Sequence, residues 1–227
     1  MTAMDSSQLL SKRVLGALGL LSGLCIFLYV LRVLATGTDR YLFTAQNLAL
    51  AWVALLFGWL LTRQLTKSSW LSWQAIGLSL LFVVFLPNSW YVLTDFWHVE
   101  PTGEISLLYD ISLVFTLVVC GFALGFISLY LIHIELMRRL SRRLSHLIIA
   151  TTLLISSFGI YLGRDLRWNT WDVVSHPEGL IINVSDRVVD PLEHPRAITV
   201  TILFFVLLST MYAAIWLASG PHKSERH

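Results

Sequence analysis

The densest group of residues able to do chemistry lies in the segment 87–98, which reads Pro-Asn-Ser-Trp-Tyr-Val-Leu-Thr-Asp-Phe-Trp-His. If a helix continues through a kink at Pro87, spacings of three, four and three place four polar side chains on one face: Asn88, Tyr91, Asp95 and His98. On that face Asp95 and His98 could share a metal ion, or act as a base and the group that orients it. The alternative is an interfacial helix whose polar stripe faces water, and the permissiveness of an isolated D-x-x-H pair favours it.

Asp110 is the second candidate, because it lies five residues into an apolar run that spans 105–134. An ionised carboxylate inside a membrane is costly unless it is paired or protonated, and such acids are candidates for function by default. The alternative is a favourable interaction with the N-terminus of its own helix, worth about 0.3 to 1 kcal/mol. The sequence leaves both interpretations open.

The third candidate is the segment 163–172, which follows the fifth apolar run and ends in Asn169, Thr170, Trp171 and Asp172. If it is helical, two guanidinium groups and two indoles share one face: Arg164, Arg167, Trp168 and Trp171. Guanidinium groups bind phosphate or carboxylate through paired hydrogen bonds, and an indole can stack on a ligand ring. The alternative, slightly favoured, is that Asp110, Asp165, Asp172 or Asp95 neutralises the two arginines and locks the helices together.

The elements that must position these residues are membrane helices. Hydrophobic residues make up 56% of the 227 residues and charged residues 13%, and the mean hydropathy of +0.71 nearly excludes a soluble protein. Six apolar runs are long enough to span a bilayer: 14–35, 42–62, 70–86, 105–134, 145–163 and 197–218. We therefore predict an all-α polytopic membrane helix bundle with six transmembrane helices, and with 88–98 as a seventh short helix, a kinked extension or a surface loop. We expect one membrane domain over 1–227.

The basic residues predict the sidedness of the bundle. When loops are assigned alternately to two faces, ten Lys and Arg residues fall on the face of the two termini and six on the other. The positive-inside rule places both termini in the cytoplasm. The opposite face carries 11 of the 14 acidic residues and all three candidate segments, so we expect any site to be extracytoplasmic.

Other features concern packing and the long loop 164–196. Glycines four residues apart, Gly19 with Gly23 and Gly121 with Gly125, predict close helix packing within the bundle rather than homodimerisation. Gln46 and Asn47 could join a polar network near the end of the second run, but a bond to the backbone of a neighbouring helix is favoured. In the long loop, Leu180, Ile181, Val184 and Val188 recur at helical spacing and predict a short amphipathic helix on the outer surface.

Several motifs together resemble a known family. These are LPNSWYVLTDFWH, LLYD, a G-x-x-x-G helix and FGIYLGRDLRWNTWD. They resemble a family of small bacterial multi-pass membrane proteins catalogued as domain of unknown function 1361, from about Asn47 to the last span. The resemblance implies a multi-pass protein of a bacterial inner (plasma) membrane, and it implies no activity, cofactor or substrate.

The one-sided distribution of polar residues favours a site over a transport pathway, because transport needs polar groups through the whole thickness of the membrane. We hypothesise an extracytoplasmic cavity that binds an anionic group, such as a lipid or polyprenyl headgroup. The residues that would converge there are Asp95, His98, Asp110, Arg164, Arg167 and Asp172, with the two arginines holding the anion. In an enzyme, Asp95 and His98 would be acid, base or metal ligands and Asp110 the second carboxylate. The alternatives are a small-solute or ion transporter and a non-catalytic membrane subunit or assembly factor. Membrane lipids are the expected partners, nucleic acid is not, and the sequence specifies no cofactor, metal or oligomeric state.

Overall fold

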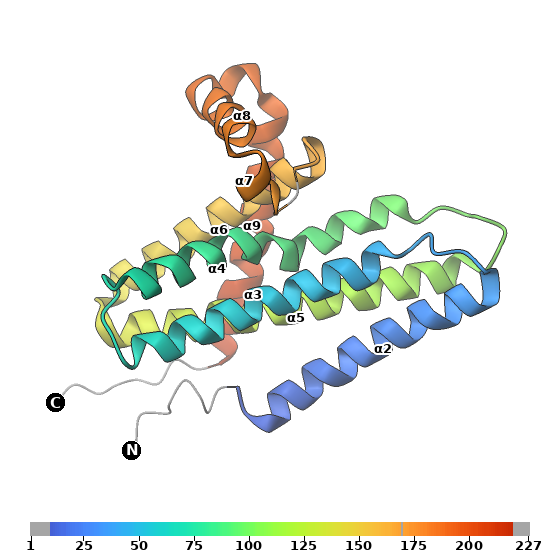
Figure 1. Ribbon diagram of the computed structural model, residues 1–227, viewed down its shortest axis with the longest axis horizontal. Coiled ribbons are helices and arrows are strands. Elements are labelled where there is room, and N and C mark those ends of the chain that lie inside the picture. The colour runs from blue at the N-terminus through green and yellow to red at the C-terminus, as the bar shows by residue number, and fades with distance from the viewer. Residues whose placement is uncertain (1–9, 169, 220–227) are drawn as a thin grey trace. The chain divides into compact units, whose positions relative to one another are not determined.

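The structure, a computed structural model, describes residues 10–168 and 170–219 (Figure 1). All regular structure in the described residues is helical, and six helices are long and apolar enough to cross a membrane. The spans are Lys12–Thr36 (α2), Phe43–Leu65 (α3), Trp73–His98 (α4 and the 3-10 helix η1), Leu107–Arg139 (α5), Arg142–Asp165 (α6) and Pro195–Ala218 (α9). The predicted all-α bundle with six membrane spans is confirmed.

The third span is longer than the predicted run 70–86, because the helix continues through Pro87. Helix α4 covers Trp73–Tyr91 and η1 follows directly over Val92–His98. Proline removes the backbone donor that would bond the carbonyl four residues earlier, and membrane helices tolerate such a loss. Directly after the proline, the side-chain amide of Asn88 donates to the carbonyl of Phe85 at 3.0 Å. Segment 88–98 is therefore a continuation of the third span.

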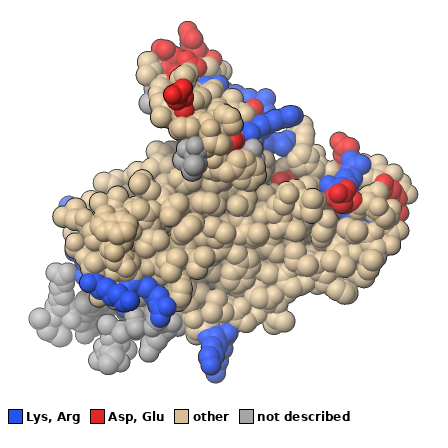
Figure 2. Space-filling view, viewed as in Figure 1, with Lys and Arg blue, Asp and Glu red and all other residues tan. Residues whose placement is uncertain are grey.

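Helices α2 to α5 belong to one compact unit, residues 1–142, and the rest of the chain forms a second, residues 143–227. The single domain over 1–227 stays a prediction. On the face shown in Figure 2, the long helices of the first unit present a broad uncharged surface, with charged side chains towards their ends.

Helix α5 is the most enclosed helix of the first unit. In its most apolar stretch 61% of the residues are buried, against 11% in that of α2. Glycines explain its close contact with α4. A Cβ added to Gly121 would overlap the carbonyl oxygen of Ser89, and one on Gly125 would lie 2.7 Å from the indole nitrogen of Trp90. The predicted packing role is thus confirmed for this pair. It is wrong for Gly19 and Gly23, since a Cβ on either would meet nothing within 4 Å.

In the second unit, three short helices connect α6 to α9: α7 (Asp172–Ser175), α8 (Pro177–Val189) and η2 (Pro191–Glu193). An ion pair between Arg196 and Asp165 joins the first turn of α9 to the last residue of α6. Helix α8 occupies the stretch for which the sequence predicts a short amphipathic helix.

Candidate functional site

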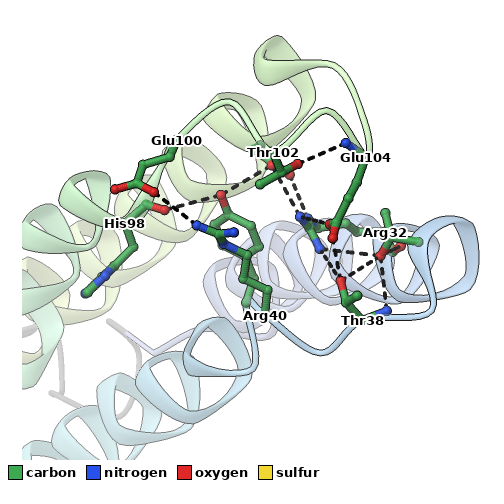
Figure 3. Close-up of polar contacts among 10 residues, drawn as sticks. Arg32, Thr38, Arg40, His98, Glu100, Thr102 and Glu104 are labelled. Atoms are coloured by element: carbon green, nitrogen blue, oxygen red, sulfur yellow. Dashed lines mark hydrogen bonds and ion pairs between the residues drawn. The ribbon is translucent and has the colours of Figure 1, made fainter.

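Polar side chains gather around Arg32, near the end of α2 and the start of α5 (Figure 3). We call this group the Arg32 cluster. It consists of Arg32, Thr36, Thr38, Tyr41, Glu104 and Asp110. Arg32 and Asp110 are 0% and 1% exposed, so the centre of the cluster is closed to solvent within the first unit.

The guanidinium of Arg32 is engaged on every side. Its Nε donates to Asp110 Oδ1 at 2.7 Å, and one terminal nitrogen reaches Asp110 Oδ2 at 3.4 Å and Glu104 Oε2 at 3.3 Å. The other terminal nitrogen donates to the hydroxyl of Thr38 at 3.1 Å. A buried ion pair offsets its desolvation only when further hydrogen bonds satisfy the remaining donors and acceptors, as they do here.

A turn directly after α2 assembles these partners. Gly37 has φ of 68°, a left-handed conformation that glycine adopts without steric cost, and its N–H donates to the carbonyl of Val33 at 2.8 Å. The helix therefore ends one turn after Arg32, and Thr38 lies beside the guanidinium. Figure 3 shows Thr38, Arg32 and Glu104 directed toward one another, with Glu104 coming from the connection between η1 and α5.

Tyr41 connects the segment 87–98 to Asp110. Its hydroxyl lies 3.3 Å from Asp110 Oδ2 and 3.5 Å from the carbonyl oxygen of His98, and the guanidinium carbon of Arg32 lies 4.4 Å from its ring centroid. Burial, the charge of Asp110 and the hydrogen bond to that carboxylate raise the pKa of Tyr41. The phenol therefore stays protonated and donates a hydrogen bond.

Asp95 and His98 differ in their surroundings. Asp95 is buried, and its Oδ2 accepts a 2.7 Å hydrogen bond from the side-chain amide of Asn47. The favoured prediction for Asn47, a bond to a neighbouring backbone, is wrong, because α3 lies beside the third span and presents the amide to a buried carboxylate. His98 is exposed, its ring lies 5.4 Å from that of Phe43, and in Figure 3 it points away from Arg32.

Arg32 is not among the candidates predicted from the sequence, although it is the partner of Asp110, which is. In the sequence it is one of the six basic residues on the predicted extracytoplasmic side. The sequence did contain a signal that could have indicated Arg32. An arginine within an apolar helix needs a carboxylate as much as an aspartate there needs a cation.

The second unit holds the basic candidates. Helix α6 ends at Asp165, and Arg167 has φ of 58°, in the left-handed region that non-glycine residues rarely adopt. The N–H of Trp168 donates to the carbonyl of Leu162 at 3.2 Å and closes the end of α6. The single helical face proposed for Arg164, Arg167, Trp168 and Trp171 does not form, because the left-handed residue interrupts the helical register. Arg164 is half-buried within α6, whereas Arg167 is exposed.

Trp168 and Asp172, two further candidates of this segment, contact residues of the second unit. The indole of Trp168 lies against α8, since a Cβ on Gly179 would be 3.0 Å from it. The carboxylate of Asp172 accepts a 3.2 Å hydrogen bond from Ser175 and lies 3.7 Å from the imidazole of His176. Asn169 lies outside the described residues.

The structure thus joins the first two candidate segments and describes the third in the other unit. The backbone of His98 and the carboxylate of Asp110 meet at Tyr41. Convergence of Asp95, His98 and Asp110 with Arg164, Arg167 and Asp172 stays a prediction. Among the described residues, no group of three or more His, Cys, Asp and Glu side chains is placed to hold a metal ion.

The sequence profile of a family described as a protein of unknown function (DUF1361) matches residues 46–211, well over half of the chain. The chain belongs to the DUF1361 family. No curated protein and no solved structure matches it significantly.

The DUF1361 match contains Asn47, Asp95, Asp110 and Arg167, but it begins after Arg32 and Tyr41. Helix α2 nevertheless makes several polar contacts with the matched region. Besides the pairs of Arg32 with Asp110 and Glu104, Trp52 donates to Ser22 at 3.0 Å and Tyr109 donates to the carbonyl of Leu28 at 2.6 Å. In this DUF1361 protein, the partner of a buried family-region acid comes from a helix outside the matched region.

Proposed function

We propose that this multi-pass membrane protein binds an anionic group, of the kind carried by a lipid or polyprenyl headgroup, where α6 ends. Arg167 and Arg164 would be its cations and Trp168 the adjacent aromatic surface. The positive-inside rule assigns this end of α6 to the extracytoplasmic face of the plasma membrane. The observation that carries the proposal is that Arg167 is exposed and has no hydrogen bond or ion pair with any described residue.

Six arginines fall on the predicted extracytoplasmic side, and four of them have identified partners. These are Arg32 with Asp110, Arg40 with Glu100, Arg187 with Tyr161 and Asn183, and Arg196 with Asp165. Arg164 is half-buried within α6. Arg167 is exposed, and no described residue forms a hydrogen bond or ion pair with it. None of its five N–H donors is therefore used by a described residue.

The position of Arg167 matches the chemistry of a headgroup. It lies two residues after the last residue of a candidate membrane span, and the ends of membrane spans meet the headgroup region of a bilayer. A guanidinium fork can bind two phosphate oxygens at once. The backbone is held in a left-handed conformation, which roughly costs 1–2 kcal/mol for a residue other than glycine.

The first unit supports a one-sided site rather than a transport pathway. Its central helix α5 carries Asp110 in its first turn and Glu135 near its other end, roughly 37 Å away at 1.5 Å per residue. Glu135 bonds Arg139 at 2.6 Å, and no charged residue of α5 lies between Asp110 and Glu135. The pairing of Asp110 with Arg32 favours a structural role for this acid, whereas catalytic roles for Asp95 and His98 remain hypotheses.

The test compares Arg167→Gly with Arg40→Ala in purified full-length protein. Glycine suits the left-handed backbone, so Arg167→Gly removes the guanidinium without stressing the fold. Arg40 is the matched control, because it is also exposed but is paired with Glu100. Native mass spectrometry would count phosphatidylglycerol bound per chain, with phosphatidylcholine and inorganic phosphate as comparison ligands.

We expect Arg167→Gly to weaken phosphatidylglycerol binding about tenfold or more, because charge-assisted hydrogen bonds contribute about 1.5–3 kcal/mol. Arg40→Ala should bind as the wild type does. Competition by inorganic phosphate would identify the phosphate as the recognised group, whereas its failure would assign recognition to the whole lipid. Equal binding by the wild type and Arg167→Gly would refute the proposal.

A further inference from the structure

One face of α3 changes from apolar to aromatic to cationic as the helix approaches its end. The side chains on this face are Leu56, Trp59, Arg63 and Lys67. Their spacings of three, four and four residues place them above one another on the helix. The helical turn extends as far as Lys67, because the N–H of Ser68 donates to the carbonyl of Gln64 at 3.0 Å. Leu56 is 47% exposed, and both basic residues are exposed. We call these four residues the α3 face.

The two cations of the α3 face are held in place but are not neutralised. The guanidinium carbon of Arg63 lies 4.5 Å from the ring centroid of Trp59, a cation–π contact that fixes the group beside the helix. No residue that the structure describes forms a hydrogen bond or ion pair with the side chain of Arg63 or Lys67. Like charges four residues apart on a helix repel each other. An anion bound between them would remove this repulsion.

The chain itself has no carboxylate to offer at this end of α3. No acidic residue occurs anywhere in the segment 43–73. Of the residues that the structure describes at the end of the spans where the termini are predicted, Glu135 is the one acid, and it already bonds Arg139 at 2.6 Å and Arg138 at 3.4 Å. Arg139 also donates to the carbonyl of Leu65, which brings a further cation to the end of α3. A second copy of the chain would bring the same surplus of cations, so the anion must come from another molecule.

The order of side chains along the α3 face follows the layers of a bilayer. Helix α3 is the candidate membrane span Phe43–Leu65, and Arg63 lies two residues before its last residue. Leu56 lies seven residues before Arg63, about 10 Å deeper at 1.5 Å per residue. The ends of membrane spans meet the headgroups, the interior meets the acyl chains, and tryptophan favours the boundary between the two. Cations, indole and exposed leucine thus lie at the depths of a lipid phosphate, its glycerol region and its acyl chains.

We infer that the α3 face binds one anionic phospholipid, such as phosphatidylglycerol, in the leaflet on the side of the chain termini. The guanidinium of Arg63 and the ammonium of Lys67 bind the phosphate, and an acyl chain lies along Leu56. The positive-inside rule predicts that this leaflet is the cytoplasmic one, where anionic lipids attract basic residues next to a span. This lipid site is separate from the one proposed at Arg167, which is predicted to lie at the opposite face of the membrane.

The test compares two double variants of the purified full-length chain. Arg63→Gln with Lys67→Gln removes both cations of the α3 face, and glutamine keeps a high helix propensity. Lys12→Gln with Arg13→Gln is the matched control, because it removes two exposed cations at the same predicted side and changes the net charge equally. Native mass spectrometry would measure the binding of phosphatidylglycerol, of phosphatidylcholine and of inorganic phosphate to each chain.

We expect the Arg63 and Lys67 variant to bind phosphatidylglycerol about tenfold more weakly or worse, because each basic residue beside an anionic headgroup adds to the affinity. The Lys12 and Arg13 variant should bind as the wild type does. The loss should be the same when Arg167→Gly is also present, which separates a failure of this inference from a failure of the site proposed at Arg167.

Three results would overturn the inference. Unchanged binding by the Arg63 and Lys67 variant would show that these cations hold no lipid. An equal loss in the Lys12 and Arg13 variant would show that only net charge matters. Complete displacement of phosphatidylglycerol by equimolar inorganic phosphate would show that the acyl chains contribute nothing. Thermal unfolding of each variant verifies the fold, which these exposed substitutions should leave unchanged.

Discussion

Arg32 and Arg167 are both predicted to lie at the extracytoplasmic ends of membrane helices, yet they have opposite surroundings. Arg32 is buried and bonded to two carboxylates and a threonine hydroxyl, and an aromatic ring lies against it. Arg167 is exposed, stands at a strained backbone position and has no partner among the described residues. The first therefore serves to hold helices together, whereas the second is the cation that we propose for a ligand. Residue type and predicted depth do not distinguish these roles.

The contrast between Arg32 and Arg167 is tested most directly at the buried pair of Arg32 and Asp110. Asp110→Leu or Arg32→Leu alone would leave one buried charge without its partner, and we expect a loss of about 3–5 kcal/mol in the free energy of unfolding. Arg167→Leu, which strands no buried charge, should cost far less. Unfolding by sodium dodecyl sulfate, followed by circular dichroism, measures all three.

The double variant Arg32→Leu with Asp110→Leu sharpens this test. Replacing both charges by apolar side chains leaves none uncompensated, so the double variant should be more stable than either single variant. If the two single losses simply add, the pair does not stabilise the first unit and the structural role assigned to Arg32 is wrong.

A smaller effect is expected at Arg167 itself. Arg167→Gly should have a free energy of unfolding roughly 1 kcal/mol higher than that of Arg167→Ala, because glycine adopts the left-handed conformation without a Cβ clash. It should therefore unfold at a higher detergent concentration. The same pair of substitutions at Arg164, which lies within α6, should give the opposite order, since glycine is the poorer helix residue. Identical stabilities of the two Arg167 variants would argue against the observed backbone conformation.

The smallest effect concerns pH. Tyr41 has a pKa raised by burial and by Asp110, so its stabilising contribution is complete below the unfolded tyrosine value of about 10 and is lost as the pH rises through the folded value. Stability of the wild type relative to Tyr41→Phe should therefore fall as the pH rises above about 10. A constant difference above that pH would mean that the phenol is not buried beside a carboxylate.

Much of the fold could be predicted from the sequence, and the contacts within the site could not. The six apolar runs correspond to the six spans, since a membrane helix shows itself in about 20 successive residues. The helical continuation through Pro87 was one of three open alternatives, because a proline is compatible both with the end of a helix and with a kink inside a membrane helix. Asp95, His98 and Asp110 were selected as candidates, but the partners of the two buried acids, Asn47 and Arg32, were not.

By itself the sequence determined that this chain is a polytopic helical membrane protein of the DUF1361 family whose acidic residues lie mostly near one end of its helices. Hydrophobic length and composition are properties of single segments, and they act before any helix meets another. Only the tertiary structure decided that Arg32 pairs with Asp110, 78 residues away, and that α6 stops before Arg167. Pairing depends on which helices become neighbours and on where each side chain points. A left-handed residue depends on how the chain leaves its helix, and neither property is written in a local pattern.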